Sequence, residues 1–129
     1  MTALALLALT ASPAAAFTHS SSVEKKALSG QEIYLYGGST LNPDCSKAGN
    51  DDVRATSGPS HGKIKIVHGK TFAFYPKKDQ RSKCNSRKVD GIRILYRSNA
   101  GFKGRDQVNL SIHTYTGNSF STVIYISVE

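Results

Sequence analysis

Apolar and polar residues alternate one by one along most of this chain, and this period of two limits its fold more than any other feature. Successive side chains of a half-buried β-strand point to opposite faces, which produces this alternation. β-Branched and aromatic residues dominate the runs, as is typical of strands. The runs cover residues 33–37, 53–57, 63–67, 71–75, 92–97, 107–113 and 123–128. They predict an all-β protein of about seven strands.

Turn-forming residues fill the gaps between these runs. Examples are Gly37-Gly38, Ser57-Gly58-Pro59 and Thr116-Gly117-Asn118, whose residue types favour tight turns. His68-Gly69-Lys70 separates two alternating runs and predicts a tight hairpin. Seven short strands with frequent turns favour a two-sheet sandwich, and a small closed barrel is the alternative.

The first 16 residues have the pattern of a secretory signal peptide. An apolar run over residues 3–9 is followed by Pro13 and then by Ala14-Ala15-Ala16, a small-residue cleavage site. The run is too short to span a bilayer, so no transmembrane segment is expected; the alternative is an ordinary apolar helix. We predict a signal peptide over 1–16, a flexible N-terminal lead-in over 17–27 and one domain over 28–129. The protein is then periplasmic or secreted.

Export determines how the two cysteines are interpreted. Cys45 and Cys84 are the only cysteines of the sequence, and an oxidising compartment favours a disulfide between them. The alternative is a metal site, but no CxxC or CxxH spacing accompanies either residue. We therefore predict one disulfide and no metal or cofactor.

Two segments together resemble immunoglobulin-like and cadherin-like repeat domains of bacteria. The first is Pro59-Ser60-His61-Gly62 followed by a strand, a short turn and a second strand that ends at Tyr75-Pro76. The second is Gly101-Phe102-Lys103-Gly104-Arg105-Asp106, followed by an alternating strand. The resemblance extends from about residue 53 to residue 128. It implies an immunoglobulin-like two-sheet sandwich, present here as a single copy.

The residues that carry this resemblance have structural roles in such domains. We expect Gly62, Gly101 and Gly104 to adopt positive φ or to sit where a Cβ would clash. We expect Phe102 to insert between the sheets and Asp106 to accept backbone N–H groups that fix the turn. Cadherin-like relatives can bind Ca²⁺ through acidic clusters, but Asp51-Asp52 lacks the surrounding Asp-x-Asp-x-Asp-Gly loop.

The most distinctive segment for function is the basic stretch 76–88, which holds six basic residues and one acidic residue in a chain of net charge +8. Such clusters attract phosphates, carboxylates and sulfates. The alternative is a solvated loop that only keeps the protein soluble. Nucleic acid is not the expected partner, because aromatic residues do not interleave with these charges. The candidate anion-binding residues are Lys77, Lys78, Arg81, Lys83, Arg87 and Lys88, and Arg93 and Arg97 extend the patch if they lie on the same face.

Other residue types point less clearly to a site. The six tyrosines offer sugar-stacking rings, although strand tyrosines are more often core-edge residues. The four histidines, His19, His61, His68 and His113, are expected to be turn and surface residues rather than metal ligands. No Gly-x-Ser-x-Gly elbow is present, and most acidic residues fall in turns, so an enzyme is not expected.

These observations predict a monomeric, non-catalytic binding or adaptor module. Its expected partner is an anionic polymer of the cell envelope, contacted by the basic segment that Cys84 tethers. The alternative is a module for another exported protein, either an inhibitor or an assembly subunit, that uses a sheet edge or a protruding loop. An enzyme is the third hypothesis, and a cleft with converging carboxylates or histidines would revive it.

Overall fold

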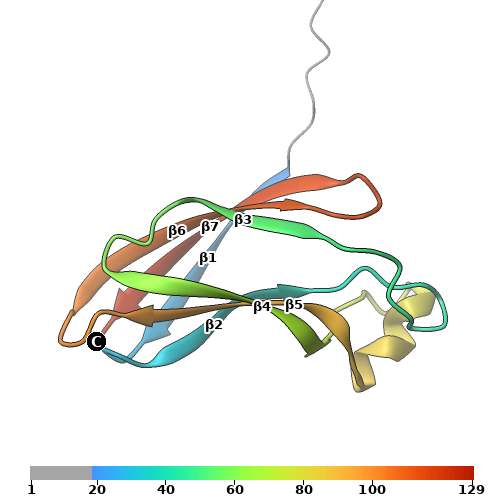
Figure 1. The fold of residues 1–129 in the computed structure, drawn as a ribbon, viewed down its shortest axis with the longest axis horizontal. Coiled ribbons are helices and arrows are strands. Elements are labelled where there is room, and N and C mark those ends of the chain that lie inside the picture. The colour runs from blue at the N-terminus through green and yellow to red at the C-terminus, as the bar shows by residue number, and fades with distance from the viewer. Residues whose placement is uncertain (1–18) are drawn as a thin grey trace, which may run out of the picture.

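The computed structural model describes residues 19–129, and this part of the chain forms seven strands and one short helix (Figure 1). One sheet has four strands in the order β1-β7-β6-β3, and the other has three in the order β2-β5-β4. The bounds are β1 His19–Ala27, β2 Glu32–Gly38, β3 Asp52–Ser57, β4 Gly62–Phe72, β5 Lys88–Ser98, β6 Gly104–His113, β7 Ser119–Val128 and the 3₁₀-helix η1 Gln80–Ser86. The predicted all-β, two-sheet sandwich is confirmed.

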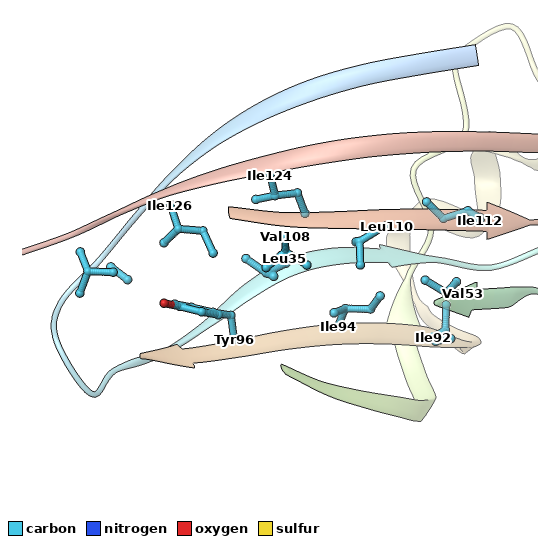
Figure 2. Packing of buried hydrophobic residues seen from close by; sticks show 12 residues of the cluster. Leu35, Val53, Ile92, Ile94, Tyr96, Val108, Leu110, Ile112, Ile124 and Ile126 are labelled. Atoms are coloured by element: carbon cyan, nitrogen blue, oxygen red, sulfur yellow. The ribbon is translucent and has the colours of Figure 1, made fainter. Parts of the chain in front are cut away.

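Alternation along the central strands produces the core between the sheets. Along β5, Ile92, Ile94 and Tyr96 are buried, and the residues between them face outward. They pack against the inward residues of β6 and β7, so the two sheets share one apolar layer (Figure 2). The inward residues of β6 and β7 are Val108, Leu110, Ile112, Ile124 and Ile126. This layer is the main source of stability, since its side chains are almost fully removed from water.

Residues 19–27 are not the flexible lead-in that we expected. They form β1, which pairs in parallel with β7 from His19 beside Phe120 to Ala27 beside Val128. Most of its side chains are exposed, and Ala27 alone belongs to the core cluster. Because β1 is an edge strand held by backbone hydrogen bonds, it needs no alternating apolar pattern, and sequence periodicity could not reveal it.

The tight hairpin predicted at His68-Gly69-Lys70 is also wrong. Gly62–Phe72 is one continuous strand, β4, and each of its residues pairs with β5 without a break in register. Gly69 lies opposite Gly91 in this ladder and does not have positive φ. Two predicted strands therefore merge into one, and β1 restores the total to seven.

The predicted signal peptide lies outside the described residues, as does the expected cleavage site. Within residues 19–129, no helix has the length and apolar character that crossing a membrane requires.

Candidate functional site

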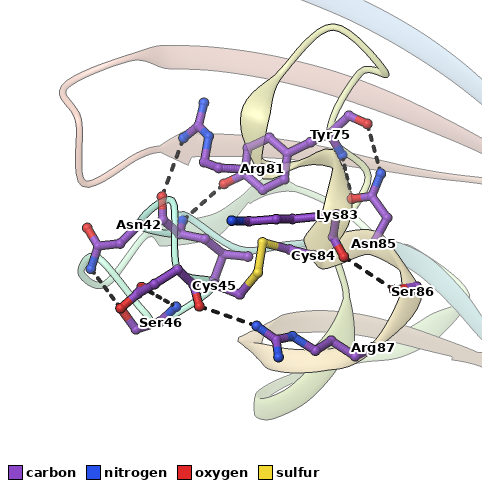
Figure 3. The surroundings of a disulfide bond; sticks show 12 residues. Asn42, Cys45, Ser46, Tyr75, Arg81, Lys83, Cys84, Asn85, Ser86 and Arg87 are labelled. Atoms are coloured by element: carbon purple, nitrogen blue, oxygen red, sulfur yellow. Dashed lines mark hydrogen bonds between the residues drawn. A yellow bond between two sulfur atoms is a disulfide. The ribbon is translucent and has the colours of Figure 1, made fainter.

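The basic segment is built onto a small second core at one end of the sandwich. Cys84 in η1 is bonded to Cys45 in the loop after β2, with their Cα atoms 5.5 Å apart, so the predicted disulfide is confirmed (Figure 3). Cys84 is fully buried, and it packs with Leu41, Ala73 and Val89. The disulfide thus lies at the centre of an apolar cluster that joins two loops to the end of the β2-β5-β4 sheet.

Tyr75 connects these two loops through four hydrogen bonds. Its hydroxyl donates to Ser39 O and accepts from Leu41 N, both at 3.0 Å. The side chain of Asn85 accepts from Tyr75 N at 2.9 Å and donates to Tyr75 O at 2.8 Å. The amide of Asn85 therefore pairs with this backbone as a neighbouring strand would, and it fixes the end of η1 to the chain beyond β4 (Figure 3).

Helix η1 was not anticipated, since its seven residues are too few to show a helical stripe. Asp79 caps its start by accepting from Arg81 N at 2.8 Å. The only signal for this helix in the sequence was Asp79, a residue type that favours the N-cap position.

Arg81, one of the six predicted anion-binding residues, is occupied by the fold itself. Its guanidinium makes two hydrogen bonds to the Asp79 carboxylate, at 2.9 and 2.7 Å, and lies 4.3 Å above the centre of the Tyr75 ring. These hydrogen bonds from Arg81 lower the pKa of Asp79 to about 2. They also raise the pKa of Arg81 above its usual value. A guanidinium with these contacts stabilises η1, and few of its N–H donors remain free for a binding partner.

Four lysines of the predicted set remain open to solvent. Within the described part of the chain, no ion pair or hydrogen bond engages the ammonium group of any of them. Arg87 is also exposed and donates to the carbonyl of Asp44 at 3.3 Å across the disulfide (Figure 3). The four open lysines are Lys77, Lys78, Lys83 and Lys88, and we call them the basic ridge.

The two arginines of β5 have different surroundings. Arg97 lies 3.7 Å from Glu32 and donates to Gly30 O at 2.7 Å, so it belongs to the far end of β2 and β5. Arg93 is half-buried and near Tyr34, Phe72 and Lys88. Of the two, only Arg93 extends the positive surface toward the basic ridge.

Asp106 lies at the opposite end of the sandwich and holds the turn before β4. It accepts hydrogen bonds from Ser60 N, His61 N and Gln107 N at 2.9 to 3.0 Å, and from Tyr96 Oη at 2.8 Å. Burial alone would raise the pKa of Asp106, but these four donors outweigh it and lower the pKa. Sequence reasoning suggested the backbone partners and missed the Tyr96 hydroxyl.

The remaining turn residues surround this carboxylate. Gly101 and Gly104 have φ of 80° and 137°, whereas Gly62 keeps ordinary φ and lies so close to the Arg97 carbonyl that a Cβ would be 2.6 Å from its oxygen. Phe102 stacks on the His61 ring with centroids 4.2 Å apart and packs against the edge of the main core. It therefore closes one end of the sandwich, partly buried.

The other chemistry-bearing residues do not converge. His113 lies between the hydroxyls of Ser111 and Ser119, and Asp51 accepts from Thr40 Oγ1 and from Tyr115 N. Over residues 19–129, no group of three or more His, Cys, Asp or Glu side chains could hold a metal ion. The tyrosines are dispersed: Tyr96 is in the core, Tyr36 is partly buried with a pKa raised by burial to about 12, and Tyr115 is exposed.

Comparison with known proteins gives no family. No family model matches the sequence, and no curated protein matches it either. Two solved structures with similar coordinates are amebosin (12% identity, TM-score 0.41, 88% of this chain and 100% of that chain) and a 2,6-sialyltransferase from Photobacterium sp. JT-ISH-224 (10% identity, TM-score 0.34, 86% of this chain and 18% of that chain). The chain spans about a fifth of the sialyltransferase. Likenesses this distant leave the function to be inferred from the site.

Proposed function

We propose that this protein is an exported, non-catalytic binding module that engages an anionic polymer of the bacterial cell envelope through the basic ridge. The proposal includes the signal peptide over residues 1–16, periplasmic or secreted placement, and kinship with bacterial immunoglobulin-like domains. Its expected mode of action is electrostatic attachment of a monomeric domain, with no cofactor.

One observation carries the proposal: the basic ridge combines open charge with a rigid base. Lys77, Lys78, Lys83 and Lys88 have no partner among the described residues, while the disulfide and Arg81 hold the backbone that presents them. A solvated loop needs neither the buried cystine nor the saturated guanidinium. A preorganised cationic surface loses less entropy on binding than a mobile one, so this construction suits recognition of a polyanion.

A salt titration tests the proposal. Binding to isolated envelope fractions should weaken steeply as salt rises, because screening acts on exposed charges. The triple variant Lys77→Glu, Lys78→Glu, Lys83→Glu should bind at least about 100-fold more weakly, taking about 1 kcal/mol per lysine near an anionic surface. The matched control is Lys26→Glu, Lys65→Glu, Lys103→Glu, which changes the net charge equally at exposed positions away from the ridge. Equal affinity of the two triple variants would exclude the basic ridge as the binding surface.

A sheet edge offers a second candidate function. β3 is the outermost strand of its sheet, and of its six residues only Val53 is buried. Its free backbone groups can receive a strand from another exported protein, such as a protease or an assembly partner. A partner retained from periplasm at high salt, and lost when proline replaces Ala55, would favour this function over the first.

A further inference from the structure

Exposed aromatic side chains gather near the end of the β2-β5-β4 sheet that carries Lys88 of the basic ridge. Phe74 is 75% exposed, Phe72 44% and Tyr34 38%, and together they line an open hollow of about 250 Å³. Lys88 and Arg93 line the same hollow. Exposed aromatic clusters of this kind mark interaction sites, because a soluble domain otherwise buries such rings.

Arg93 is the unsatisfied group of this hollow. Its Nε atom is buried without a hydrogen-bond partner, and its guanidinium makes no ion pair among residues 19–129. Lys70, which also borders the hollow, is neutralised by Asp90 at 2.9 Å, so the uncompensated charge belongs to Arg93 and Lys88. The half-buried Arg93 guanidinium therefore lacks a counter-ion, and a carboxylate bound in the hollow would supply one.

A second hollow shares Phe74 with the first. This second hollow, of about 190 Å³, is lined by Phe74 together with Tyr36, Ser39 and Tyr75. Gly37 belongs to its lining and also lies under the Tyr34 ring, which a Cβ at Gly37 would overlap. The exposed Phe74 side chain is therefore common to both hollows.

The position of the hollows determines the kind of partner. Tyr34, Arg93 and Phe72 come from β2, β5 and β4, so the first hollow draws on all three strands of the sheet instead of following one edge strand. A peptide added as an extra strand would need an edge. Two hollows that share an aromatic residue fit a linear chain of cyclic units better than a flat bilayer.

We propose that these two hollows bind an acidic polysaccharide, with sugar rings against Phe72 and Phe74 and a uronate carboxylate on Arg93 and Lys88. A pyranose ring has an apolar C–H face that suits an aromatic ring, and a uronate adds a carboxylate that suits Arg93 and Lys88, which line the first hollow. The inference rests on the proposed function and specifies its substrate class. The ridge supplies attraction, and the hollows supply selectivity for sugars.

The test compares four probes by isothermal calorimetry: polygalacturonate oligosaccharides, neutral dextran, polyglutamate, and vesicles of anionic phospholipid. We expect polygalacturonate to bind best and dextran not at all. Phe74→Ala should weaken polygalacturonate binding about tenfold while leaving the weaker polyglutamate binding unchanged, because only sugar rings use the aromatic face. Arg93→Gln should weaken polygalacturonate binding about tenfold as well.

Tyr115→Ala is the matched control, because Tyr115 is an exposed aromatic residue outside both hollows. Phe74 is largely exposed, so its removal leaves folding intact, and circular dichroism checks this. Equal binding of polyglutamate and polygalacturonate, insensitive to Phe74→Ala, would overturn the sugar inference and leave the proposed function standing. Preference for the vesicles would overturn it in favour of a lipid surface. Absence of binding to every polyanion would overturn both.

Discussion

The hydroxyl of Tyr96 donates a 2.8 Å hydrogen bond to Oδ2 of Asp106, and both side chains are buried. The tyrosine comes from the three-stranded sheet and the aspartate from the four-stranded sheet, so this bond joins the two layers. The same carboxylate holds the backbone of Ser60 and His61 at the start of β4. One acidic side chain thus fixes both the sheet packing and an incoming turn.

Replacing Asp106 should strongly destabilise the domain. Asp106→Ala leaves three backbone N–H groups and one hydroxyl without their acceptor, and we expect a loss of about 3 kcal/mol in the free energy of unfolding. Tyr96→Phe removes a single hydrogen bond and should cost about 1 kcal/mol. Urea denaturation measures both values, and an Asp106→Ala protein as stable as the parent would contradict the assignment.

Asp106 should also govern part of the acid sensitivity. Its pKa is lower in the folded protein than in the unfolded chain, so its stabilisation is complete above the unfolded value of about 3.9. That stabilisation is lost as the pH falls through the lower, folded pKa. Asp106→Asn should therefore show a flatter decline of stability with acid than the parent, measured by urea denaturation between pH 5 and 2.

Asp79 should stay ionised in conditions where most carboxylates are protonated. Its pKa of about 2 follows from the hydrogen bonds of Arg81. We expect Arg81→Lys to return this pKa toward its usual value, because lysine cannot form the paired hydrogen bonds of a guanidinium. NMR titration of the Asp79 side-chain carbon measures the pKa. Lys83→Ala, on the same helix, should leave the curve unchanged, and an unaltered curve in Arg81→Lys would refute the explanation.

The disulfide should contribute a large part of the stability. Replacing Cys45 and Cys84 together by alanine should lower the free energy of unfolding by about 3–4 kcal/mol in the chain-entropy model for a closed loop of this length. Because Cys84 is fully buried, reductant alone should act slowly on the folded domain. Thiol alkylation followed by mass spectrometry, with and without denaturant, measures that protection. Rapid reduction of the native protein would show that the small core opens easily.

Two glycines should respond in opposite directions to alanine. Gly69 lies inside β4 with ordinary φ and open space around its Cβ position, so Gly69→Ala should stabilise the domain by about 0.5 kcal/mol. Gly58 has φ of 72°, and a Cβ there would overlap the carbonyl oxygen of Gln107. Gly58→Ala should destabilise by more than about 1 kcal/mol. If Gly69→Ala proved as damaging as Gly58→Ala, the continuous strand through residue 69 would be in doubt.

The sequence was informative wherever one face of a strand is buried. The period of two in β5, β6 and β7 follows directly from the shared core, and these strands could be predicted. The edge strand β1 escapes this rule, because it buries little more than Ala27. Glycine was misleading at position 69, since its presence permits a turn without requiring one.

The candidate site could be predicted only in part from the sequence, for a related reason. A run of basic residues reveals its charge but not which members are already paired, and Arg81 is paired by Asp79 two positions away. The aromatic hollows were hidden because Phe72 and Phe74 occupy positions that a strand pattern assigns to the core. Phe72 ends β4 and Phe74 follows it, and their exposure depends on the tertiary arrangement alone.

The parallel pairing of β1 with β7 has a mechanical consequence. Because His19 lies beside Phe120 and Ala27 beside Val128, the described chain starts and finishes at opposite ends of this strand pair. A pulling force applied between those ends would shear the two strands along their length. All of their hydrogen bonds would then be loaded at once instead of breaking one after another.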